Sequence, residues 1–188
     1  MLRTCSTIGA SKARGFSLLE VMVALCVLAV GLLGVVKLES VAYSSTNIAS
    51  KRSVAALQAA SLAASMHINR GYWNSPDVSG AIITATDGVL AVTASAPVLG
   101  GLIGAAQNCA AVAVPCVPSV MAAYDLQQWA ASVKTLLLNQ NSISTITCGT
   151  SNPVSCMINI QWSENTVATN AQETGTLAGP SYTLYVEP

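Results

Sequence analysis

Glu20 is the residue of this chain whose chemistry stands out first, because it is a lone carboxylate in a long apolar run. Residues 16–36 contain only two markedly polar residues, Ser17 and Glu20. As a helix, this run spans roughly 30 Å, the thickness of the hydrocarbon core of a bilayer. A charge inside a membrane costs on the order of 3 kcal/mol and marks a candidate functional site. The alternative is that Glu20 lies shallow enough to reach the interface and has no role.

The Gly15–Phe16 peptide bond directly precedes this apolar run. An ordinary secretory signal is cut after its apolar region, next to small residues, whereas here the plausible cut lies before it. Such a cut would keep the apolar segment and give Phe16 a free amine four residues from Glu20, on the same helix face. Residues 1–15 carry three basic residues and no acidic one. The positive-inside rule therefore predicts a cytoplasmic leader and an exported chain from Lys37 onward.

Cysteine chemistry is the second candidate. Four cysteines follow the apolar run: Cys109, Cys116, Cys148 and Cys156. Four cysteines allow three connectivities, of which nearest-neighbour pairing is the simplest. Zinc is the competing interpretation, but neither pair has C-x-x-C spacing and the single histidine, His67, is remote. Disulfides imply an oxidising compartment such as a bacterial periplasm, while Cys26, inside the apolar run, is expected to stay reduced.

Other function classes find little support in the composition. The chain is 52% hydrophobic and only 9% charged, and residues 16–188 hold five basic against eight acidic residues. This balance gives no basic patch for nucleic acid. The chain lacks a nucleophile-elbow, zinc-protease or Walker motif, and three aspartates, Asp77, Asp87 and Asp125, are too scattered for a calcium site. We therefore expect no enzyme, no metal and no cofactor.

A long helix must position these groups. Residues 37–69 contain no proline or glycine, and their apolar residues recur at helical spacing. The stripe consists of Leu38, Val41, Ile48, Ala55, Ala59, Leu62 and Met66. We predict one helix from Phe16 to about Arg70, ended by Gly71, with the stretch from Leu57 to Met66 packed on the chain's own domain.

The remainder predicts a small mixed domain. Strands are expected over Ala81–Thr86 and Gly88–Ser95, around an Asp87-Gly88 turn. Residues 99–104 predict a flexible apolar loop. A helix over Ser119–Gln140, capped by Ser119, has an apolar face made of Leu126, Trp129, Ala130, Val133, Leu136 and Leu137. Antiparallel strands are expected over Ser142–Cys148, Cys156–Ser163 and Ser181–Glu187.

The sequence R14-G15-F16-S17-L18-L19-E20, followed by its apolar run, resembles the processing site of type IV pilins. The resemblance implies that a prepilin peptidase cuts between Gly15 and Phe16, that Phe16 is N-methylated, and that Glu20 guides assembly by pairing with a subunit's new amine. Residues 121–129 (MAAYDLQQW) and 157–162 (MINIQW) are similar to the PilV family of type IV pilus minor pilins. Asp125 and Trp129 could then be a partner-binding pair, although a structural role, with Trp129 in the core and Asp125 in a local hydrogen bond, is the commoner explanation.

The resemblance implies an α+β, pilin-like fold, with a long N-terminal helix on a small antiparallel sheet and an extra helix. Its parts would be a cleaved leader (1–15), a transmembrane half-helix (16–36), an amphipathic half-helix (37–70) and a periplasmic domain (71–188). The implied partners are prepilin peptidase, other minor pilins, the major pilin, the inner membrane and its pilus assembly platform. Two alternatives stay open. One is a pseudopilin of a type II secretion system, and the other is a membrane-tethered binding domain with a coincidental leader.

Overall fold

The computed structural model describes residues 15–188 except 94, 106–107, 111–115, 138–141 and 164–178. Most of the leader, one residue of the second predicted strand and the end of the predicted helix at Gln140 lie outside the described residues. The chain divides into two compact units, Met1–Tyr43 and Ser44–Pro188. Each unit is described by itself below.

One long helix, α1 (Leu18–Ile68), confirms the predicted N-terminal helix. Its end differs slightly from the prediction. Asn69 separates α1 from a one-turn helix, α2 (Arg70–Trp73), so Gly71 lies inside that turn rather than ending α1. The backbone N–H groups of Tyr72 and Trp73 donate to the Asn69 carbonyl, which starts the new turn at this residue.

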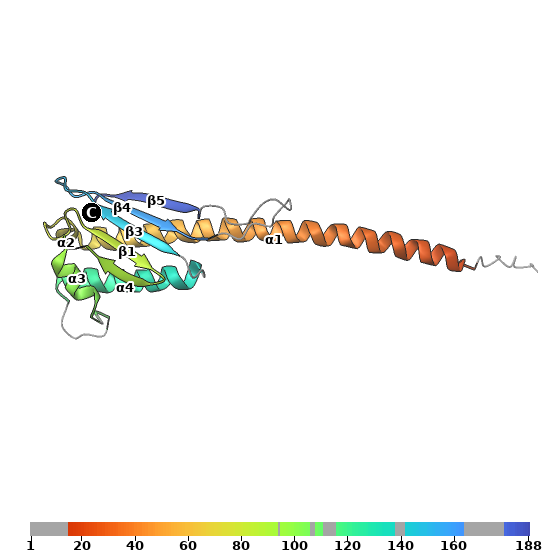
Figure 1. Cartoon of the computed structure of the whole chain (residues 1–188), viewed down its shortest axis with the longest axis horizontal. Helices are drawn as coiled ribbons and strands as arrows, with labels where there is room; N and C mark the ends of the chain where they lie inside the picture. Colours follow the sequence, from red (N-terminus) through yellow and green to blue (C-terminus); the bar gives the residue numbers. More distant parts are fainter. Residues whose placement is uncertain (1–14, 94, 106–107, 111–115, 138–141, 164–178) are drawn as a thin grey trace, which may run out of the picture. The chain divides into compact units, whose positions relative to one another are not determined.

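The second unit contains a five-stranded antiparallel sheet with the order β2-β1-β3-β4-β5 (Figure 1). Its strands are β1 (Ile82–Thr86), β2 (Val89–Val92), β3 (Ile143–Cys148), β4 (Cys156–Gln161) and β5 (Ser181–Val186). These strands and their antiparallel pairing confirm the predicted sheet.

The predicted hairpin turn is also present. Asp87 and Gly88 both have positive φ, 50° and 78°, as the tight connection between β1 and β2 requires. A side chain at Gly88 would also meet the Lys134 Cδ atom at 2.9 Å. Gly88 therefore serves both the turn and the close approach of the hairpin to a neighbouring helix.

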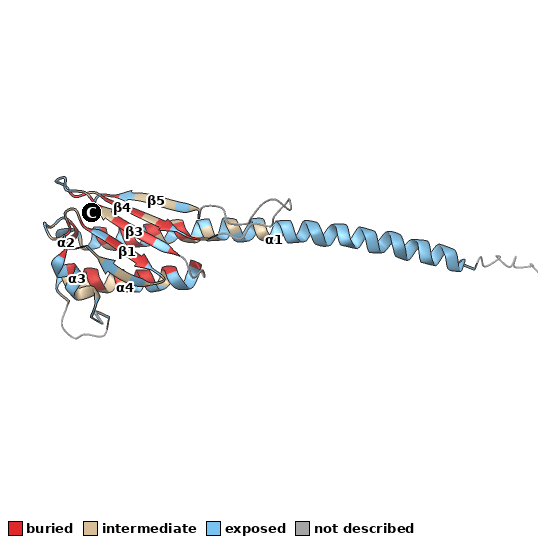
Figure 2. Cartoon of the chain, viewed as in Figure 1, coloured by how far each residue is buried: buried red, intermediate tan, exposed pale blue. Residues whose placement is uncertain are grey.

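The strand register sorts the side chains into a covered face and a solvent face. One row of paired residues runs across all five strands on the covered face: Val92, Ile83, Ile146, Ile158 and Leu184. The matching row on the other face is polar apart from its first member: Ala91, Thr84, Thr145, Asn159 and Thr183. Because strand side chains alternate, the sheet has one apolar face for helices to cover. Figure 2 shows buried residues on β1, β3 and β4.

Helix α4 (Pro118–Leu137) supplies part of that cover and confirms the predicted second helix. It begins at Pro118, so Ser119 lies inside it and the prediction of Ser119 as the cap was wrong. Leu136, expected on the apolar face, is 48% exposed, whereas Leu137 is buried. The residues 99–104, expected to be a loop, belong largely to α3 (Pro97–Ile103). Leu99 is fully buried there, and Pro97 at the first helical turn favours this start.

The second half of α1 contributes the rest of the cover. Its buried residues are Ala55, Ala59, Leu62, Ala63 and Met66. Leu57, which we expected to pack on the domain, is 67% exposed. Five residues of helix turn Leu57 about 140° away from Leu62, which places it off the buried stripe. Leu38 and Val41, predicted in the same stripe, are exposed.

Candidate functional site

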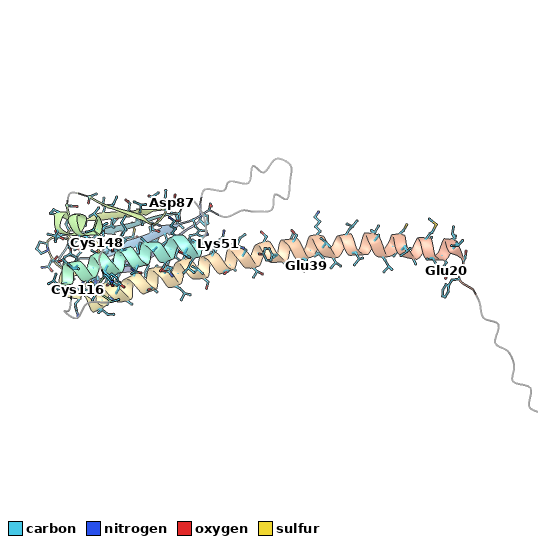
Figure 3. All side chains as sticks on the ribbon, turned by 90° about the horizontal axis from the view of Figure 1, so that it is seen from below. Glu20, Glu39, Lys51, Asp87, Cys116 and Cys148 are labelled. Atoms are coloured by element: carbon cyan, nitrogen blue, oxygen red, sulfur yellow. A yellow bond between two sulfur atoms is a disulfide. The ribbon has the colours of Figure 1, made fainter. Side chains whose placement is uncertain are left out.

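The segment from Gly15 to Glu20 forms the start of α1. Gly15, Phe16 and Ser17 precede the helix, and the backbone N–H groups of Glu20 and Val21 donate to the Ser17 carbonyl at 3.0 and 3.3 Å. Phe16 is 81% exposed and outside the helix. The expectation that Phe16 and Glu20 share one helix face is therefore wrong for this uncut chain. Figure 3 shows Glu20 in the first turn.

Local physics makes the first turn a favourable place for the Glu20 carboxylate. The unpaired N–H groups at a helix N-terminus carry a partial positive charge that stabilises an acidic side chain there. Ser17-Leu18-Leu19-Glu20 also fits the capping-box pattern, in which a serine and a glutamate three residues later flank the helix start. The sequence therefore makes a carboxylate at this point compatible with a stable helix end.

The first unit has the properties of a membrane anchor. An 18-residue stretch of α1 near the N-terminus has a mean hydropathy of 2.7, so the helix is long and apolar enough to cross a membrane. Its apolar side chains are exposed, as Figure 2 shows. The thiol of Cys26 is free and exposed.

Both disulfides of the simplest connectivity are present in the structure. Cys109 is joined to Cys116, with their Cα atoms 5.8 Å apart, and both residues are half-buried. Cys148 is joined to Cys156 across a Cα–Cα distance of 4.0 Å. These two residues are register partners on β3 and β4, and both are buried. The second bridge therefore joins neighbouring strands at the end of the sheet core.

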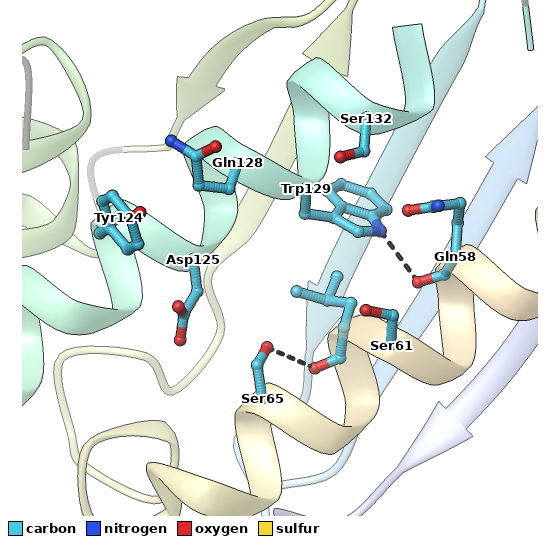
Figure 4. A pocket seen from close by; sticks show the side chains of 9 residues that line it. Gln58, Ser61, Ser65, Tyr124, Asp125, Gln128, Trp129 and Ser132 are labelled. Atoms are coloured by element: carbon cyan, nitrogen blue, oxygen red, sulfur yellow. Dashed lines mark hydrogen bonds between the residues drawn. The ribbon is translucent and has the colours of Figure 1, made fainter. Parts of the chain in front are cut away.

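A groove in the second unit lies between α1 and α4 and has a volume of about 250 Å³ (Figure 4). It is lined by Gln58, Ser61, Leu62 and Ser65 from α1, and by Tyr124, Asp125, Gln128, Trp129 and Ser132 from α4. The sequence predicts Asp125 and Trp129 as a pair but not the groove that contains them. The signal for the groove in the sequence is polar residues at helical spacing on both helices.

The predicted pair Asp125 and Trp129 lies in this groove, and the two residues have different environments. Trp129 is 5% exposed and its indole N–H donates to the Gln58 carbonyl at 3.0 Å, which confirms its structural role. Asp125 is half-buried, and burial raises the pKa of its carboxyl above the ordinary value. The described part of the chain offers this carboxylate no hydrogen bond or ion pair, so the expected local hydrogen bond is absent.

The other titratable candidates do not meet. Asp77 binds locally: it accepts a 2.6 Å hydrogen bond from the Tyr72 hydroxyl, and its other oxygen accepts the Val98 N–H at 3.3 Å. Burial, followed by the hydrogen bond to Asp77, raises the pKa of Tyr72. His67 is exposed near the end of α1. Within the described ranges, no group of three or more metal-ligating side chains occurs.

Comparison with known protein families gives one match. The family described as "Prokaryotic N-terminal methylation motif" matches residues 10–36, which include Gly15, Phe16 and Glu20. No curated protein and no solved structure matches the chain. The motif indicates a type IV pilin-like protein, either a pilin or a pseudopilin. A leader of this type implies processing by prepilin peptidase and assembly with other pilins, and together with the apolar helix it fits anchoring in the inner membrane.

Proposed function

We propose that this chain is a minor pilin of a type IV pilus, of the PilV type, that helps to prime filament assembly. The observation that carries the proposal is the methylation motif over residues 10–36, which spans the Gly15–Phe16 bond and the Glu20 carboxylate. The similarity of residues 121–129 and 157–162 to PilV proteins supports the finer assignment.

In this proposal, prepilin peptidase hydrolyses the Gly15–Phe16 bond, and the new amine of Phe16 is methylated. The processed chain stays in the inner membrane through the first half of α1, with its disulfide-bonded domain in the periplasm. When the leader is gone, Phe16 and Ser17 are free to extend α1 by two residues, about half a turn, because the backbone before Phe16 no longer continues. The cationic amine of Phe16 then lies at a similar depth in the membrane to the Glu20 carboxylates of the subunits. The low dielectric there strengthens the attraction between amine and carboxylate.

The position of the Glu20 carboxylate in the membrane-spanning half of the helix supplies the reason for assembly. A carboxylate carried into a bilayer is costly, and a cationic amine from a neighbouring subunit offsets that cost. No step of this role needs a catalytic group in the chain itself. We propose that the protein is the substrate of an enzyme and not an enzyme.

The second candidate is a pseudopilin of a type II secretion system, because the methylation motif is common to both groups. The periplasmic disulfides and the Asp125–Trp129 helix favour the minor-pilin proposal through their similarity to PilV proteins.

The test uses the full chain in cells that carry the pilus machinery. Filaments are sheared from the cells, and the N-terminus of the chain is determined by mass spectrometry. We expect a chain that starts at methylated Phe16 in the filament fraction, and loss of piliation and twitching when the gene is deleted. A chain that keeps residues 1–15 contradicts the processing step, whereas loss of exoprotein secretion with normal piliation identifies a pseudopilin.

A further inference from the structure

We propose that the groove between α1 and α4 receives a lysine or arginine side chain from a neighbouring pilin subunit, with Asp125 as the acceptor. The inference rests on the proposed assembly with other pilins, and it adds a contact in the globular unit to the one expected at Phe16 and Glu20.

The chemistry of the groove selects a cation. Among the residues that the structure describes, Asp125 is the one charged residue in the lining, and no lysine, arginine or histidine of these ranges lines it. An anionic ligand would meet this carboxylate without a compensating charge. A metal ion would find a single carboxylate where hard cations take six or more oxygen ligands. An ammonium or guanidinium group, in contrast, gains a charge-assisted hydrogen bond.

The remaining lining residues fit a long side chain with a cationic end. Serine and glutamine side chains from both helices offer oxygen acceptors, and Tyr124 offers an aromatic face beside Asp125 (Figure 4). Leu62 supplies an apolar surface for the stem of the incoming side chain. A volume of about 250 Å³ lies below the range for drug-sized ligands, which begins at roughly 300 Å³, and suits one inserted side chain.

Within the described ranges of the chain, no hydrogen bond or ion pair compensates Asp125. Trp129 one turn away uses its N–H group for the Gln58 carbonyl, and Ser65 donates its hydroxyl to the Leu62 carbonyl at 2.9 Å. Both donors are therefore used for backbone carbonyls rather than for the Asp125 carboxylate. Burial disfavours the charged form of Asp125, as the direction of its pKa shows, and a cationic partner would offset that cost.

The charge of the second unit is consistent with a cationic partner surface. From Ser44 onward the sequence holds four basic and six acidic residues, a formal charge of −2. Protein association is favoured when potentials are complementary, and a carboxylate at a partly desolvated position then contributes both affinity and register. The methylation motif makes another pilin-like subunit the available partner.

The test compares tagged full-length chains captured from detergent-solubilised membranes. Asp125→Asn removes the charge with little change in shape, and Asp125→Lys reverses it. Glu187→Lys is the matched control, because Glu187 is an exposed acidic residue of the same unit outside the groove. Captured partners are classed as pilin-like by a processed, N-methylated N-terminus. Intact disulfides and unchanged protease resistance show that each variant is folded.

We expect Asp125→Asn to lower the recovery of pilin-like subunits about tenfold, as loss of a partly buried charge pair does, and Asp125→Lys to abolish it. Glu187→Lys should recover the wild-type amount, and an acidic substitution of the partner's cation should restore binding to Asp125→Lys. Equal recovery by all variants overturns the proposal. A wild-type chain that captures no pilin-like subunit also overturns the proposal. This holds even if the groove binds free arginine amide or putrescine. Capture that depends on Asp125, in a chain absent from sheared pili, sustains this inference while contradicting the minor-pilin function.

Discussion

The two units of this chain use their apolar side chains in opposite ways. In the first unit, every described residue up to Tyr43 is exposed, including the whole apolar run. In the second unit, leucines, isoleucines and tryptophans on α1, α4 and the sheet form a buried core. The apolar residues of the first unit are therefore available to lipid or other subunits, whereas those of the second stabilise the fold. Substitutions should accordingly affect processing and assembly in the first unit, and the free energy of unfolding in the second.

The largest effect expected in the first unit is a block of processing. Gly15→Arg should leave the chain uncut and held in the membrane, because a bulky residue replaces the smallest one at the scissile bond. Intact mass of the membrane fraction measures this directly. The second unit should keep both disulfides. A chain cut normally after the substitution, or cut elsewhere in wild type, would contradict the assigned site.

The next effect separates assembly from stability. Glu20→Ala should leave the free energy of unfolding of the second unit unchanged, because Glu20 belongs to the first unit, and should strongly reduce incorporation into filaments. The measurement is the amount of processed chain in sheared pili relative to membranes. Glu39→Ala, which removes an exposed carboxylate from the same helix, is the control. Normal incorporation of the Glu20→Ala variant would contradict a role for Glu20 in assembly.

In the second unit, the sharpest contrast lies between two leucines of α1. Leu62 is 1% exposed and Leu57 is 67% exposed. Leu62→Ala should lower the free energy of unfolding by about 2–5 kcal/mol, because it leaves a cavity in the core. Leu57→Ala should change it by less than about 0.5 kcal/mol. Urea denaturation of the full chain in detergent measures both, and equal values would mean that the buried stripe is misassigned.

The two disulfides should also differ in how much stability their removal costs, with the more buried one costing more. Each closes a short loop, with sequence separations of 7 and 8, so each constrains the unfolded chain by about 2–3 kcal/mol. Cys148 is also buried, at the end of β3 where it pairs with Cys156 of β4, whereas Cys109 is half-buried. Cys148→Ser should therefore lower the midpoint of thermal unfolding more than Cys109→Ser. Peptide mapping without reductant should first show both native pairs in wild type.

The smallest effect concerns pH. Burial raises the pKa of Asp125 in the folded chain above its ordinary value of 3.8, so the folded state binds this proton more tightly than the unfolded state. Ionisation of Asp125 then costs stability as pH rises through that raised pKa. Asp125→Asn should be slightly more stable than wild type at neutral pH, and the difference should shrink in acid. A variant that is less stable at neutral pH would show that the carboxylate already has a partner within the chain.

Most of the fold could be predicted from the sequence. The Asp87-Gly88 turn, the alternation in β3, β4 and β5, and the absence of proline and glycine over residues 37–69 are local signals that act through backbone sterics. The predictions were wrong where contacts with other parts of the fold decide the local structure. The composition of residues 97–103 is typical of a loop, but the segment folds as α3 because Leu99 is buried in the core. The exposure of Leu57 likewise depends on which side of α1 meets the sheet.

The sequence by itself determined the N-terminal candidate site. Gly15, Phe16 and Glu20 lie within six consecutive residues, so their spacing along the chain is enough to define a cleavage bond and a carboxylate beside it. The groove around Asp125 was decided by tertiary structure, because Gln58 and Trp129 on its two walls are 71 residues apart in the sequence. No local pattern specifies that Gln58 faces Trp129. Only the burial of both helices against one face of the sheet brings them together and places the Asp125 carboxylate between them.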